Sequence, residues 1–109
     1  MDEPLPLVEL EKGKDRSVDF VGPGVNDWDW DDYTPCGLIC TDLSLDLNTD
    51  TSADAETKES GKVLRIHFVS STDHGSAVSG LYRYGLYGTT GGKTVRVGTE
   101  GTLAILPAT

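Results

Sequence analysis

The clearest pattern along this chain is an alternation of apolar and polar residues that begins shortly after Pro35. Residues 39–47 read Ile-Cys-Thr-Asp-Leu-Ser-Leu-Asp-Leu, so apolar side chains, together with Thr41, recur at every second position. A period of two places alternate side chains on opposite faces of a β-strand. The pattern predicts one half-buried strand over residues 39–47, followed by a polar, exposed loop over residues 48–61.

The second half of the chain contains a series of further strand signals. The predicted strands span residues 62–70, 77–87, 93–98 and 102–106. Short connections rich in turn residues separate them, so they are expected to form an antiparallel meander. Gly80 and Gly85 interrupt the segment 77–87, which indicates bulges, strong coiling or the close approach of another backbone. No segment repeats its apolar residues with a helical period, so no helix longer than a turn or two is expected.

The first 34 residues have the composition of an extended arm. Pro4 and Pro6 stiffen its start, and Gly22-Pro23-Gly24 interrupts any regular element. Two short strands, over residues 7–10 and 18–21, would bury too little surface alone and are expected to lie against the domain or a neighbouring copy. The sequence therefore predicts an all-β protein: a small antiparallel sandwich or barrel over residues 35–109, preceded by an extended acidic N-terminal arm over residues 1–34.

Charge is distributed unevenly along the chain, whose net charge is −9. Residues 1–60 contain 16 acidic and 4 basic residues, whereas residues 61–109 contain 2 acidic and 5 basic residues. No Lys or Arg occurs between Ser17 and Thr57, a stretch with ten acidic residues. This charge must be solvated, bound to a metal or matched by another surface, and it indicates recognition without naming a partner. It argues against direct binding of nucleic acid, which needs a concentrated basic face.

Both tryptophans lie in one acidic stretch, residues 26–33. In an extended conformation, Trp28 and Trp30 would share one side and the alternate aspartates the other. The tryptophans either pin the arm to the core or anchor an interface, where the carboxylates would select a cationic partner. The residues predicted to bind a partner are Trp28, Trp30, Asp27, Asp29, Asp31, Asp32 and Tyr33.

A second acidic stretch resembles part of a calcium-binding loop. Its alternate oxygen-bearing residues are Asp46, Asn48, Asp50, Ser52 and Asp54. Calcium takes six to eight oxygen ligands, which alternate residues of a curved loop can supply. However, Thr51 stands where the sharp turn needs Gly, and Thr57 stands where a bidentate Glu would close the site. The stretch is a weak calcium candidate, and the alternative is a solvated acidic loop. No other cofactor is indicated.

Other chemical motifs have structural interpretations. Cys36 and Cys40 are spaced one residue more widely than a redox or zinc pair, which predicts two reduced thiols, one or both of them buried. Gly91-Gly92-Lys93-Thr94 resembles the end of a phosphate-binding loop, but a strand follows it, which predicts a hairpin turn. His67 and His74 lack the local context of a nucleophilic triad and are expected to face solvent. The three tyrosines over residues 82–87 are expected to pack at the edge of the core.

These observations favour a non-enzymatic structural or assembly subunit, and specifically a small virion protein that is associated with a capsid or decorates it. The expected partners are other copies of the chain, a larger shell protein, or both. The alternative is an acidic inhibitor or nucleic-acid mimic that occupies a cationic groove on a partner protein. A calcium-dependent binding module is a third class. The sequence shows no signal peptide or membrane-spanning run, so the expected location is the virion or the cytoplasm of a host cell.

Overall fold

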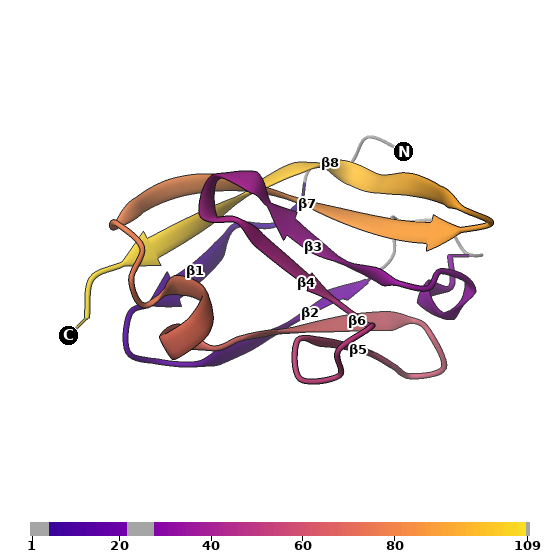
Figure 1. The fold of residues 1–109 in the computed structure, drawn as a ribbon, viewed down its shortest axis with the longest axis horizontal. Coiled ribbons are helices and arrows are strands. Elements are labelled where there is room, and N and C mark those ends of the chain that lie inside the picture. Colours follow the sequence, from indigo (N-terminus) through magenta and orange to yellow (C-terminus); the bar gives the residue numbers. More distant parts are fainter. Residues whose placement is uncertain (1–4, 22–27, 109) are drawn as a thin grey trace.

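A computed structural model describes residues 5–21 and 28–108 of the chain, which form strands joined by short turns (Figure 1). The strands are β1 (Val8–Glu11), β2 (Arg16–Val21), β3 (Cys36–Cys40), β4 (Leu45–Asn48), β5 (Ala55–Lys58), β6 (Val63–Phe68), β7 (Gly80–Thr90) and β8 (Lys93–Leu106). Two single turns of 3-10 helix, η1 (Trp30–Asp32) and η2 (Thr41–Leu43), and one π-helical turn, η3 (Ser70–His74), complete the described elements. The prediction of an all-β protein is confirmed.

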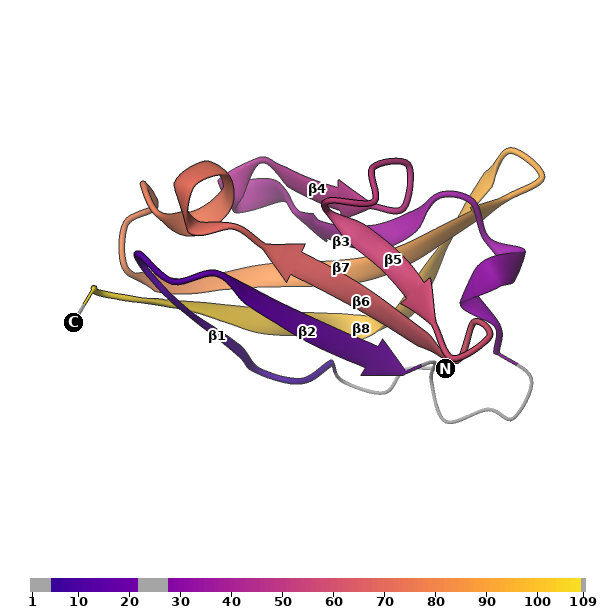
Figure 2. The ribbon, with the colours of Figure 1, turned by 90° about the horizontal axis from the view of Figure 1, so that it is seen from below.

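The strands form two sheets that enclose one core (Figure 2). The first sheet has five strands in the order β1-β8-β7-β3-β4, and the second has three in the order β2-β6-β5. The predicted antiparallel arrangement is wrong for one pair, because β1 lies parallel to β8. The turn after β1 leads into β2 of the opposite sheet, so β1 cannot pair with the strand that follows it. It pairs instead with the C-terminal end of β8.

The prediction of an extended acidic arm is wrong for the residues that can be described at the start of the chain. β1 and β2 are integral strands, one in each sheet, and they confirm the two short strands expected there. Burial explains this placement, since Val8, Leu10 and Phe20 are at most 3% exposed. Residues 1–4 and 22–27 of the predicted arm lie outside the described part of the chain.

The alternating segment over residues 39–47 is a hairpin, not the single strand predicted. β3 and β4 pair antiparallel on either side of η2, and Ser44 takes a left-handed conformation with φ of 55°. The inward face changes at the turn: β3 directs Leu38 and Cys40 into the core and leaves Ile39 half-buried, whereas β4 directs Leu45 and Leu47 inward. The polar stretch 48–61 also differs from the predicted loop, because its residues 55–58 pair with β6 as β5.

The predicted meander over residues 62–106 is wrong in its connections. β6 belongs to the second sheet, and η3 returns the chain to the first. β8 is one strand of 14 residues instead of two short strands. The hairpin turn is confirmed: Gly91 and Gly92 connect β7 to β8 with positive φ angles of 54° and 77°. The bulge expected near Gly85 is also confirmed by a register shift between Tyr84 and Leu86.

The core contains both cysteines as free, fully buried thiols, which confirms the prediction made for them. Burial raises the pKa of Cys36 and of Cys40, because the thiolate loses hydration. Reactivity of a thiol requires both access and thiolate character.

We therefore expect neither Cys36 nor Cys40 to react with a thiol reagent such as DTNB while the protein is folded. Both should react at the rate of a free thiol once urea unfolds the chain. The measurement is the time course of absorbance with and without urea. A thiol that reacts rapidly in the folded protein would contradict the burial described here.

Candidate functional site: an acidic recess beside a cationic hairpin

The acidic tryptophan segment folds into η1 instead of an extended strand. Asp29 Oδ1 accepts a hydrogen bond from the backbone N–H of Asp31 at 2.9 Å, which caps the turn. The N–H of Trp30 donates to the carbonyl of Gly61 at 2.8 Å and ties η1 to the end of the loop before β6. The turn directs Trp30 into the core, where it is 0% exposed, and leaves Asp31 and Asp32 exposed.

The three aromatic rings of this segment pack on one another. Trp28 meets Trp30 edge to face with ring centroids 5.4 Å apart, and it stacks on Tyr33 at 4.7 Å. The ring of Tyr33 lies on Gly88 of β7, where any Cβ would be only 2.7 Å from it. Trp30 therefore pins the segment to the core, and Trp28 and Tyr33 are the aromatic residues with surface left for a partner. Asp27, the remaining predicted residue, lies outside the described part.

A recess of about 330 Å³ opens between η1 and the segment that leads into β5. Its lining residues are Asp31, Tyr33, Thr34, Thr49, Ser52, Ala55, Glu56 and Thr57. Thr57 Oγ1 donates to Asp31 Oδ1 at 2.6 Å and joins the two walls. The structure thus brings together two residues predicted to bind a partner, Asp31 and Tyr33, and one residue of the calcium candidate, Ser52. Glu56 was missed because β5 was not predicted.

The two carboxylates of the recess have different surroundings. Lys58 Nζ lies 2.9 Å from Glu56 Oε1, and His67 Nε2 lies 2.7 Å from Glu56 Oε2. Both hydrogen bonds lower the pKa of Glu56 from its usual value, and the one from Lys58 has the larger effect. Asp31 and its neighbour Asp32 form no ion pair with any residue in the described ranges. Their negative charge is available to a partner.

The residues of the calcium candidate are divided between two places: Asp46, Asn48 and Asp50 line one pocket of about 440 Å³, whereas Ser52 lines the acidic recess. Asp46 lies on β4, where its Oδ1 accepts hydrogen bonds from Asn48 Nδ2 at 3.0 Å and from the hydroxyl of Tyr87 at 2.6 Å. The N–H of Asp50 donates to Asn48 Oδ1 at 3.0 Å. Desolvation raises the pKa of Asp54. Within residues 5–21 and 28–108, no three His, Cys, Asp or Glu side chains are placed to hold a metal ion, and calcium binding stays a prediction.

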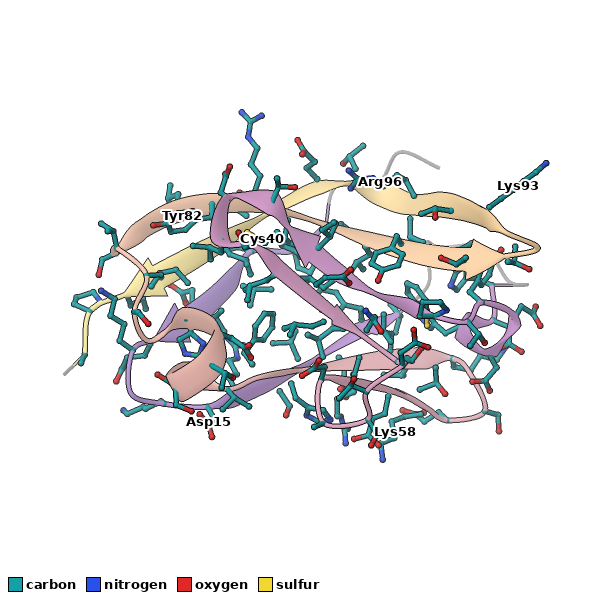
Figure 3. The ribbon with its side chains drawn as sticks, viewed as in Figure 1. Asp15, Cys40, Lys58, Tyr82, Lys93 and Arg96 are labelled. Carbon is teal, nitrogen blue, oxygen red and sulfur yellow. The ribbon has the colours of Figure 1, made fainter. Side chains whose placement is uncertain are left out.

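The β7–β8 hairpin lies directly beside this recess. The N–H of Thr34 donates to the carbonyl of Thr89 at 2.8 Å, and the N–H of Thr89 donates to the carbonyl of Pro35 at 2.9 Å. Beyond that contact the hairpin is exposed from Thr90 to Arg96. Figure 2 shows its end projecting past the other strands, and Figure 3 shows Lys93 extending away from the ribbon there.

A polar chain on the outer face of the second sheet joins Ser17, His67 and Glu56. Ser17 Oγ lies 2.7 Å from His67 Nδ1, and His67 Nε2 lies 2.7 Å from Glu56. A nucleophilic serine also needs N–H donors that are free to bind an oxyanion.

The backbone donors where the chain leaves β6 next to this group are already engaged. The N–H groups of Val69 and Ser70 donate to the carboxylates of Asp73 and Asp15 at 2.7 and 2.8 Å. We interpret the hydrogen bonds among Ser17, His67 and Glu56 as pairing of polar side chains between neighbouring strands.

The prediction of a solvent-facing histidine is wrong for His74, which is 0% exposed. Its Nε2 lies 3.1 Å from the carbonyl oxygen of Glu11 and 3.0 Å from that of Lys14. Two carbonyl acceptors require Nε2 to carry the proton and to donate. His74 therefore clamps the turn between β1 and β2 to η3, which explains its burial.

The predicted packing of the tyrosines is confirmed for the two that are buried. Tyr84 is 1% exposed and its hydroxyl donates to the carbonyl of Pro6 at 2.6 Å. Tyr87 is 8% exposed and donates to Asp46. Burial is the main reason why the pKa of both phenols is raised.

No family model matches the sequence, and no curated protein matches it. Among the described residues, no helix is long and apolar enough to cross a membrane.

Proposed function

We propose that this protein is a non-enzymatic assembly subunit that binds other proteins through the end of the molecule that carries the acidic recess. The observation that supports this most directly is the composition of that end. Exposed carboxylates of Asp31 and Asp32, partly exposed rings of Trp28 and Tyr33, and the exposed cationic hairpin lie side by side. Aromatic residues ringed by charge are typical of protein interfaces.

Within this class, we propose a small virion protein that is associated with a capsid or decorates it, located in the virion or in the cytoplasm of the host cell. Its net charge of −9 fits an outer position better than contact with packaged nucleic acid. The partners are other copies, a larger shell protein, or both. Two β-sheets around one core provide a rigid scaffold, which suits a subunit that presents a binding surface.

An acidic inhibitor or nucleic-acid mimic is the alternative. A mimic must present its carboxylates to a cationic groove, yet several of those described here already have partners within the chain. Arg65 binds both carboxylate oxygens of Asp19, at 2.7 and 3.0 Å, and Glu56 binds Lys58 and His67. Because these charges are internally neutralised, we favour the assembly subunit.

Co-sedimentation tests the proposed function. The chain is expressed together with the products of the genes on either side of its own, and the lysate is separated on a density gradient. An assembly subunit should sediment with a large particle and stay bound after washing. A chain that stays at the top of the gradient, while a neighbouring gene product forms particles, would exclude this role.

A further inference from the structure

The end of the β7–β8 hairpin is exposed to solvent along its whole length. From Thr90 to Arg96 every residue is exposed, and a Cβ added at Gly91 or Gly92 would have no neighbour within 4 Å. Pairing between its own two strands holds it, such as Thr90 with Lys93 and Gly88 with Val95, and at its base the guanidinium of Arg96 lies over Gly85. A two-stranded ribbon is marginally stable in water by itself. Contact with another molecule would stabilise this one.

The charge of the hairpin defines the surface that would suit it. Lys93 and Arg96 form no ion pair with the residues that the structure describes. The side chain of Val95, between them, is 38% exposed. A partner should therefore offer carboxylates and an apolar or aromatic contact.

The recess of the chain itself offers those groups. It carries the carboxylate of Asp31, which forms no ion pair with any described residue, with Asp32 beside it, and Tyr33 forms part of its wall. The backbone hydrogen bonds of Thr89 with Thr34 and Pro35 place the recess directly beside the hairpin. A cationic and an anionic surface that lie next to each other make a self-complementary patch, which is the requirement for an interface with two-fold symmetry.

We propose that two copies of this chain form a two-fold dimer in which the hairpin of each, through Lys93 and Arg96, lies against the acidic recess of the other. This inference rests on the proposed function, because it names one partner of the same surface. Both copies carry a net charge of −9, so the local attraction acts against a general repulsion. Salt near 0.1 M screens that repulsion beyond roughly 10 Å while the close pairs persist, whereas 1 M salt weakens the pairs too.

The test compares charge-reversal variants by sedimentation equilibrium in 0.1 M salt. K93E/R96E and D31K/D32K should each dimerise at least ~10-fold more weakly than the wild type, because each sets like charges against one another. Their equimolar mixture should form a heterodimer, because the reversed hairpin then faces a reversed recess. The matched control is K12E/K14E, which reverses two charges at the β1–β2 turn, at the other end of the molecule (Figure 1), and should dimerise like the wild type.

Circular dichroism is used to check that every variant is folded, which is expected because all the changed residues except the half-buried Lys12 are exposed. A wild type that remains monomeric in this assay overturns the dimer, and so does dimerisation that K93E/R96E leaves unchanged. A monomer that still sediments with a shell particle would refute the dimer and leave the proposed function standing. A dimer that never sediments with such a particle would refute the proposed function and leave the dimer standing.

Discussion

Replacement of Trp30 by Ala should lower the free energy of unfolding by about 3–5 kcal/mol, the usual cost of removing a large aromatic side chain from a core. The indole is 0% exposed and packs edge to face on Trp28. Its removal leaves a cavity and also loosens η1, whose residue Asp31 lines the recess. Urea unfolding followed by far-ultraviolet circular dichroism measures the change.

Trp28→Ala is the matched control for this prediction. Trp28 is only partly buried, so its removal should cost clearly less stability, because less apolar surface returns to water. Equal losses in the two variants would show that Trp30 is not the residue that pins the segment to the core.

The second large effect is expected for His74→Ala, at about 2–4 kcal/mol of unfolding free energy. The imidazole is fully buried and bridges the carbonyl oxygens of Glu11 and Lys14, which belong to the turn between the two sheets. Its loss leaves a cavity and removes a donor from both carbonyls. Thermal unfolding of the variant gives the measurement.

Thr72→Ala serves as the control, because Thr72 is an exposed residue of η3, the turn that also contains His74. Its replacement should change the free energy of unfolding by less than about 0.5 kcal/mol. His74→Gln keeps an N–H donor and should recover part of the loss. If His74→Ala were as stable as Thr72→Ala, the clamp between β1–β2 and η3 would contribute nothing.

The alternation of residues could predict strands but not how they connect. Over residues 39–47 the sequence alternates without a break, although the buried positions change from even to odd at η2. Ser44 adopts the left-handed conformation there without being Gly or Asn. A hairpin and a single strand therefore have the same sequence pattern here. The turn at Gly91–Gly92 was predictable, because both residues need positive φ angles and Gly provides them freely.

The candidate site was predictable only in its separate parts. The acidic aromatic segment was visible as a sequence of Asp and Trp, but the inward direction of Trp30 depends on a hydrogen bond to Gly61. The recess arises because β5 pairs with β6 and brings Glu56 and Thr57 beside Asp31. Such contacts between distant segments leave no periodic signal in the sequence.

The parallel pairing of β1 with β8 also has a consequence during synthesis of the chain. Residues 8–11 leave the ribosome well before their partners, residues 103–106. Until then Val8 and Leu10 have no strand beside them, and the first sheet cannot close. Pairing of segments so distant in the sequence makes closure of this sheet a late step in the folding of the domain.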